Sequence, residues 1–233
     1  MRLGKLACVR TETPTTEVQH PIPRMLQAIR RSIAPYPRAT LFELHEQGYD
    51  SVFEQLCACV LSIRTLDETS LPASIELFER ARTPQELLKL SDEEIYGCIH
   101  TCTFAHQKVS TLRKIAQAIQ ERGHEPRNFE ELTDLPGVGP KCANLVLGIA
   151  CGVPAIGVDI HVHRITNRWG YVAASTPEKS LNALTQKLPR KHWVEINELL
   201  VPFGKHVCTG TLPHCSTCPV YGNCERVGVT KHR

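Results

Sequence analysis

The sequence has few aromatic residues and no long apolar run. Phe, Trp and Tyr together make up 6% of the 233 residues. No stretch approaches the roughly 18 uninterrupted apolar residues of a membrane-spanning helix, which excludes that class. The first ten residues also lack the apolar centre of a secretory signal. We therefore expect a cytoplasmic protein that does not enter a membrane.

A disulfide framework is also unexpected, although cysteine is plentiful. The chain has 11 cysteines, an odd number, and no export signal accompanies them. Seven of them are scattered, mostly among Ala, Leu, Val and Ile, where a cysteine is typically a small buried apolar side chain. These seven are Cys8, Cys57, Cys59, Cys98, Cys102, Cys142 and Cys151. The remaining four lie together near the C-terminus.

No strong excess of one charge exists over the whole chain, but the charge is unevenly distributed. The net charge is +3. Residues 1–44 and residues 187–233 each contain seven Lys or Arg against three acids, whereas the middle contains thirteen against eighteen. The imbalance serves either to solvate the surface or, if the two ends meet in space, to form a basic face that attracts a polyanion.

Alternating patterns typical of β-strands are absent, and helical periodicity dominates. Capping-box patterns begin at Ser51, Thr83 and Ser91, and Gly123 follows an apolar stripe as a stop signal. These signals predict an all-α protein of about nine or ten helices. Residues 1–23 are read as a flexible lead-in, residues 45–153 as a central helical domain, and residues 24–44 with 154–233 as a second helical unit. The chain is expected to cross between the two units near residues 152–157.

A short turn with two glycines is the first candidate for a functional site. It reads Leu135-Pro-Gly-Val-Gly-Pro140 and is followed by an apolar helical stretch. Glycines allow a tight turn and a close approach of the backbone to a ligand. The free N–H groups of the following helix would then form an anion site suited to a DNA phosphate. Gly137, Val138 and Gly139 are the expected contacts, although such a turn also occurs as an ordinary connection between helices.

Lys141 follows this turn directly, in the first turn of the predicted helix. An ammonium group is not a nucleophile, but a lysine that is shielded from water and close to a positive helix end yields the free amine more readily. Asp159 lies downstream in Val158-Asp-Ile-His-Val-His-Arg164. Taken by itself, an aspartate in this position is typical of a helix cap or an ion-pair partner of Arg164.

Together these segments resemble the helix-hairpin-helix and aspartate motifs of the endonuclease III family of DNA glycosylases. The resemblance runs from about residue 24 to the C-terminus. It implies that Lys141 attacks C1′ of a damaged nucleotide, releases the base and forms a Schiff base from which the 3′ phosphate is eliminated. It also implies that Asp159 assists the attack, that damaged DNA lies in a groove between the two helical units, and that the protein acts as a monomer on oxidised pyrimidines.

The four remaining cysteines form the pattern Cys208-x6-Cys215-x2-Cys218-x5-Cys224. Four thiolates suit zinc as well as an iron–sulfur centre. Zinc ribbons usually carry two Cys-x-x-Cys pairs, whereas this segment has one, and a wide cubane cluster fits spread-out spacing. The endonuclease III family has the same spacing around a [4Fe–4S] cluster, so the resemblance implies that cofactor.

The chain departs from the family at positions that would touch DNA. Arg64 stands where the family has a glutamine that fills the gap left by the flipped nucleotide. Phe104 and His106 are the candidate wedge residues, and Ile160 replaces a typical threonine. His161 and Lys205 are further expected DNA contacts.

We therefore expect a bifunctional glycosylase and abasic-site lyase of base excision repair. Two alternatives remain open. One is a DNA-binding repair scaffold with weak or no turnover, for which Arg64 and Ile160 are the motivation. The other is a monofunctional mismatch glycosylase, although relatives of that kind generally lack a lysine in this turn.

Overall fold

The computed structural model describes residues 20–233, and within this range the regular structure is entirely helical. Twelve α-helices are present in these residues, more than the nine or ten expected, because several are too short to give a full apolar stripe. They are α1 Ile22–Ile33, α2 Thr40–Glu46, α3 Val52–Ser62, α4 Asp67–Phe78, α5 Pro84–Lys89, α6 Asp92–Ile99, α7 Ala105–Arg122, α8 Phe129–Thr133, α9 Pro140–Ile149, α10 Ile160–Arg168, α11 Pro177–Lys187 and α12 Glu195–His206. Three short 3₁₀ turns span Arg190–His192, Cys215–Thr217 and Tyr221–Asn223.

The start signals read from the sequence form real caps. The side chains of Ser51, Thr83 and Ser91 each accept a hydrogen bond from the backbone N–H of the glutamate three residues later, and the carboxylate of that glutamate accepts one from the backbone N–H of the cap residue. Gly123 ends α7 in the left-handed conformation, with φ of 78°. These local interactions satisfy backbone groups that would otherwise lack partners, so they define the helix ends without tertiary help.

The start of the first helix differs from the sequence expectation. Helix α1 begins at Ile22, inside the segment that was read as a lead-in, and Ile22 itself is buried. Pro23 lies in the first turn of α1, where proline is tolerated because its missing N–H has no intrahelical acceptor. Residues 1–19 of the expected lead-in, with Cys8, lie outside the described residues.

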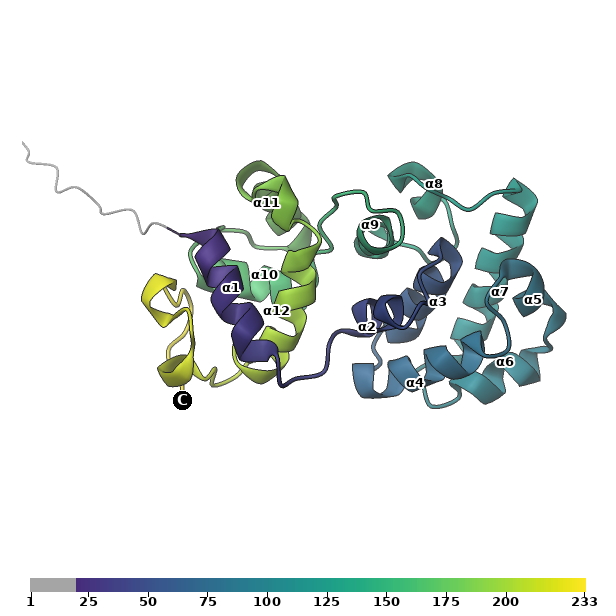
Figure 1. Ribbon diagram of the computed structural model, residues 1–233, viewed down its shortest axis with the longest axis horizontal. Coiled ribbons are helices and arrows are strands. Elements are labelled where there is room, and N and C mark those ends of the chain that lie inside the picture. The colour runs from purple at the N-terminus through teal and green to yellow at the C-terminus, as the bar shows by residue number, and fades with distance from the viewer. Residues whose placement is uncertain (1–19) are drawn as a thin grey trace, which may run out of the picture.

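Two hydrophobic cores organise the helices. The first is formed by α2 to α9 and includes Phe53, Leu77 and Ile115. The second joins α1 to α10, α11 and α12, which come from the far end of the chain, and includes Met25, Trp169 and Phe203. Figure 1 shows these as two lobes, with α1 lying alongside α12. The chain returns from α9 to α10 through residues 151–159, which have no regular structure.

The scattered cysteines behave as apolar side chains. Of those in the described part of the chain, Cys57, Cys59, Cys98, Cys102 and Cys142 are buried, and Cys151 is half-buried. Burial raises the pKa of Cys98, Cys102 and Cys151, since it disfavours the charged thiolate. All six are part of the first core or pack against it, which confirms the expectation that they are small apolar side chains.

Candidate functional site: a groove between the two cores

A groove of about 720 Å³ lies between the two helical groups, which is large enough for a nucleotide-sized ligand. One wall comes from the first core: the segment before α2, the turn after α3, and the start of α9. The opposite wall comes from α10, α11 and α12. Of the residues singled out in the sequence, the groove brings together Arg64, Lys141, Asp159, His161 and Lys205.

The two-glycine turn forms as the sequence predicts. Gly137 has φ of 79°, the left-handed conformation that glycine adopts most easily, and Gly139 caps α9, with Pro140 in the first helical position. Val138 differs from expectation, because its side chain is buried and its N–H donates to the carbonyl of Leu135 at 3.2 Å. Its side chain thus packs into the first core, while the exposed Gly137 and Gly139 present backbone to solvent.

Lys141 lies at the open end of α9 and its side chain is exposed. A lysine yields its free amine more readily when it is both close to a positive helix end and shielded from water. The structure supplies the first and not the second, because the groove is open in the protein alone. Any shielding of this amine must come from a ligand that closes the groove.

Asp159 caps α10, as a sequence reading without the family would suggest. Its Oδ1 accepts hydrogen bonds from the N–H groups of His161 at 2.9 Å and Val162 at 2.8 Å. The other possibility, an ion pair with Arg164, does not form, since that guanidinium donates instead to carbonyls of Gly204 and Cys208. Capping uses only one oxygen of the carboxylate, so the other is available to the groove that Asp159 lines.

The segment before Asp159 is held in place by buried contacts. The amide of Asn144 donates to the carbonyl of Ile156 at 3.1 Å, and the amide of Asn197 donates to that of Gly157 at 2.9 Å. A Cβ on Gly157 would lie 2.5 Å from Leu145 on α9, so only glycine allows this close approach. These contacts fix the crossing segment against α9, and Asp159 consequently lies in the same groove as Lys141.

His161 and Lys205 line the groove but already have partners inside the protein. Burial lowers the pKa of His161, and its Nδ1 accepts a hydrogen bond from Arg164 at 3.0 Å. Lys205 on α12 pairs with Asp67 on α4 at 2.6 Å and with Glu68 at 3.7 Å. The Lys205 ammonium therefore links the two walls of the groove.

Arg64 and Phe104 meet at the edge of the first core. Both side chains are exposed, and the Arg64 guanidinium carbon lies 5.8 Å from the centre of the Phe104 ring. Both residues have positive φ, 53° for Arg64 and 59° for Phe104. That backbone conformation costs about 1 to 3 kcal/mol for a side chain other than glycine, so the surrounding structure must maintain it. His106, the other candidate wedge, stacks instead on Tyr96, with ring centres 4.3 Å apart.

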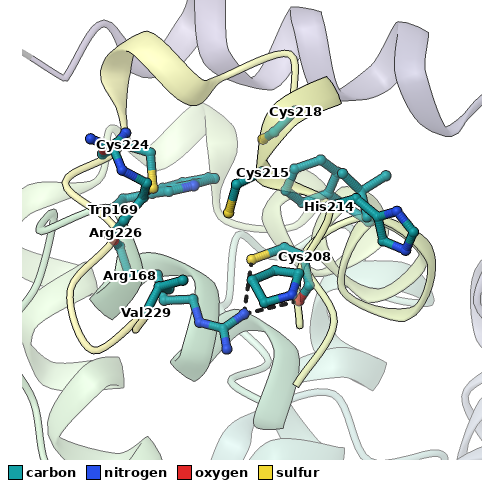
Figure 2. A pocket seen from close by; sticks show the side chains of 12 residues that line it. Arg168, Trp169, Cys208, His214, Cys215, Cys218, Cys224, Arg226 and Val229 are labelled. Carbon is teal, nitrogen blue, oxygen red and sulfur yellow. Dashed lines mark hydrogen bonds between the residues drawn. The ribbon is translucent and has the colours of Figure 1, made fainter. Parts of the chain in front are cut away.

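The four C-terminal cysteines surround one cavity (Figure 2). Arg168 lies beside them, with its guanidinium 3.4 Å from the sulfur of Cys208 and bonded to the carbonyl of Thr209 at 2.6 Å. Arg226 also lines this cavity. Burial raises the pKa of Cys218 to about 11, and it also raises the pKa of Cys215 and Cys224.

The donor set of this cavity fits an iron–sulfur cluster. Four cysteine sulfurs are the usual ligands of a cubane cluster, and two neighbouring guanidinium groups offset the negative charge of such a thiolate-bound centre. A single metal ion is a different case from a cluster, because among residues 20–233 no group of three or more His, Cys, Asp or Glu side chains is arranged to hold one. Within the same residues, no helix is long and apolar enough to cross a membrane.

Comparison with known proteins identifies the class first. Residues 57–190 match the family described as HhH-GPD superfamily base excision DNA repair protein, which makes this chain a member of that superfamily. Endonuclease III of Thermotoga maritima is 43% identical over 175 residues, covering 74% of this chain and 82% of the relative. The chain therefore belongs to the endonuclease III family within that superfamily, as its motifs indicated.

Two further comparisons extend this result. Endonuclease III-like protein 1 of Bos taurus is 38% identical over 171 residues, which cover 71% of this chain but only 56% of that longer protein. The solved structure of a trapped endonuclease III–DNA covalent intermediate superposes with a TM-score of 0.70 at 30% identity, covering 86% of this chain and 96% of that one. The all-helical fold is thereby confirmed.

The structure also reveals a residue that the sequence analysis missed. Lys108 is buried and donates hydrogen bonds to the turn that carries Arg64. The spacing of Lys108 in the sequence could have indicated its burial, because it shares a helical face with three buried residues, Leu112, Ile115 and Ile119. A lysine on an otherwise apolar face needs a polar partner, and that partner could not be named from the sequence.

Proposed function

We propose that this protein is a bifunctional DNA glycosylase and abasic-site lyase in which Lys141 is the nucleophile. The observation that carries the proposal is the placement of Lys141 and Asp159 in one groove between two helical groups. The family membership supplies the reaction class. The substrate is double-stranded DNA with an oxidised pyrimidine or an abasic site, and the site is complete within a single chain, which favours a monomer.

The reaction begins with the free amine of Lys141. Its Nζ forms a bond to C1′ of the flipped nucleotide, the bond between C1′ and the base breaks, and the electron pair leaves with the base. The carboxylate oxygen of Asp159 that does not cap α10 accepts the proton released by the amine and stabilises positive charge on the sugar. Ring opening gives a Schiff base, and loss of a proton from C2′ then expels the 3′ phosphate. DNA that closes over the groove supplies the shielding that Lys141 lacks in the free protein.

The remaining contacts hold the DNA. The exposed backbone of Gly137 and Gly139, beside the positive end of α9, suits a phosphate. Arg64 and Phe104 enter the duplex, with Arg64 filling the gap opposite the flipped nucleotide. Arginine donates hydrogen bonds but accepts none, so it favours an orphan guanine over bases that must donate. His161 faces the flipped nucleotide from α10, whereas Lys205 reaches a phosphate only if its ammonium leaves Asp67.

The cofactor that we propose for the cysteine cavity is a [4Fe–4S] cluster, with zinc as the alternative. Cys208, Cys215, Cys218 and Cys224 would hold it. When bound, such a cluster ties a loop that has little hydrophobic core of its own. The chemistry at the sugar belongs to Lys141 and Asp159, and Asp159 lies at the opposite end of α10 from the cysteine cavity.

Borohydride trapping on an abasic duplex tests the nucleophile. Reduction of a Schiff base leaves the protein covalently bound to DNA, so the natural chain should give an adduct and Lys141→Ala should give none. Lys114→Ala, an exposed lysine on α7, is the matched control and should trap normally.

The same assay decides between the alternatives. Tight binding to several lesions with no adduct from the natural chain would support the repair scaffold. Base release with no adduct would support a monofunctional glycosylase.

A further inference from the structure

Lys108 is a buried charged residue that the proposed reaction does not use. It lies in the first turn of α7, only 5% exposed, and its side chain reaches toward the end of α3. Its Nζ donates to the carbonyl of Leu61 at 2.7 Å, the carbonyl of Ile63 at 2.9 Å and the Oγ1 of Thr65 at 2.8 Å. An ammonium has three N–H donors, so every donor of Lys108 has an acceptor.

All three acceptors belong to the turn that carries Arg64. Leu61 is near the end of α3, where carbonyl groups lack intrahelical partners, and Ile63 and Thr65 flank Arg64 on both sides. Three directional bonds to residues around Arg64 leave its backbone little freedom. They explain how a non-glycine residue is maintained at φ of 53°.

The same network reaches the wedge. The Oγ1 of Thr65 also accepts a hydrogen bond from the backbone N–H of Thr103 at 3.2 Å, the residue before Phe104. The N–H of Lys108 donates in turn to the carbonyl of Phe104 at 3.1 Å. Lys108 and Thr65 therefore join the Arg64 turn to the Phe104 turn, which is consistent with the two exposed side chains lying against each other.

We propose that Lys108 is a positioning residue that sets Arg64 and Phe104 as one rigid pair for insertion into duplex DNA. This inference rests on the proposed function, in which those two side chains enter the duplex. The pair acts on the gap and on the partner strand, and not on the sugar that Lys141 attacks. Its disruption should consequently affect duplex substrates selectively.

The burial of Lys108 is consistent with this role. Burial lowers its pKa, since the ammonium loses water contact, while the three acceptor oxygens compensate for that loss. A purely structural role as a cap of α3 would also explain the bonds to Leu61 and Ile63. A purely structural role predicts that loss of Lys108 affects cleavage of duplex and single-stranded DNA equally. The positioning role predicts a larger effect on the duplex, and that difference provides the test.

The experiment compares strand cleavage at an abasic site in a duplex with cleavage at the same site in single-stranded DNA. Lys108→Met keeps an unbranched side chain, one atom shorter than lysine, and removes its donors. Because displacement of contact groups by about 1 Å can cost roughly 100-fold in rate, we expect Lys108→Met to lose roughly 10- to 100-fold on the duplex and less than about threefold on the single strand. Lys114→Met, on the exposed face of α7, should match the natural chain on both substrates.

Thr65 variants keep the test decisive if Lys108→Met does not fold. Thr65→Val removes the hydroxyl that bonds Lys108 and Thr103, and should produce the same duplex-selective loss. Thr65→Ser keeps the hydroxyl and should cleave both substrates as the natural chain does. An equal loss on both substrates, or no loss in a folded Thr65→Val protein, overturns the inference. Absence of Lys141-dependent cleavage by the natural chain would instead overturn the proposed function.

Discussion

Asp159 combines two roles that a single substitution can separate. Its Oδ1 caps α10, and its other oxygen is available to the groove. Asparagine caps a helix about as well as aspartate, but it carries no charge and does not accept a proton at neutral pH. The chemical role and the structural role therefore differ in their dependence on the carboxylate.

We expect Asp159→Asn to lose about 100-fold in the rate of base release, because removal of a group that stabilises charge in the transition state typically slows a reaction by about that factor. Its melting temperature should stay close to that of the natural chain. Asp159→Ala should lose the same activity and in addition about 0.5 to 2 kcal/mol of stability, since the cap is removed. Thermal unfolding beside a base-release assay measures both. Full activity in the folded asparagine variant would leave Asp159 with the capping role alone.

At the same scale, the sequence predicted residue types better than residue environments. The position of Lys141 directly after the glycine turn could be seen in the sequence. The exposure of its side chain could not be predicted, because the opposite wall of the groove comes from α10 to α12, more than a dozen residues away along the chain. Val138 looked like part of an open turn, yet it packs into the first core. Lys108 carried a signal in its helical face, whereas its acceptors near Arg64 follow only from the packing of α7 against α3.

At the scale of elements, the helix ends were predictable and the crossings between helices were not. Caps at Ser51, Thr83 and Ser91 depend on neighbouring residues only, so their patterns suffice. Short helices such as α2 contribute too few apolar positions to establish a period, and the expected number of helices was consequently too low. The start of α1 was missed for a related reason, since proline in a first turn resembles proline in a linker.

The turn before α9 depends on its backbone conformation, which two glycine substitutions can test. Gly137 has positive φ, and a Cβ there would lie 3.0 Å from the Thr111 side chain. Gly137→Ala should destabilise the protein by about 1 to 2 kcal/mol and weaken DNA binding, because the turn presents the phosphate site. Gly97→Ala, on the exposed side of α6 with free space around it, should instead stabilise by roughly 0.5 to 1 kcal/mol without changing DNA affinity.

Denaturant unfolding and a DNA titration on the two variants check this pair. Equal DNA affinity for Gly137→Ala and the natural chain would show that the phosphate is bound elsewhere. A destabilised Gly97→Ala would show that the exposed face of α6 has a packing role that its surroundings do not reveal.

At the scale of the whole molecule, the two ends of the chain complete one core. Helix α1 packs on α12, and Cys208, Cys218 and Cys224 pack against the same cluster of buried residues. Among the described residues, the basic side chains of α1 and of the C-terminal segment thus belong to one half of the molecule. Two ion pairs then connect this half to the other. Lys205 on α12 pairs with Asp67 on α4, and Arg38, just before α2, pairs with Glu198 on α12.

The cysteine cavity provides a prediction at this scale. Protein purified without oxygen should contain about four iron and four sulfide per chain. Cys218→Ser should lose most of its iron and sulfide. It should also have a lower melting temperature and weaker DNA binding, because the loop that follows α12 would no longer be held by the cluster and would pack less well against the second core. Cys151→Ser, a half-buried cysteine beside the first core, is the matched control and should keep its iron.

Metal analysis with thermal unfolding on these proteins decides the matter. One zinc per chain with no sulfide would replace the cluster with the alternative metal. Undiminished iron in Cys218→Ser would remove that cysteine from the ligand set. If the expected result is obtained, the second core, built from segments far apart in the sequence, depends on cofactor binding for part of its stability. The first core, in contrast, holds the Lys141 turn by packing alone.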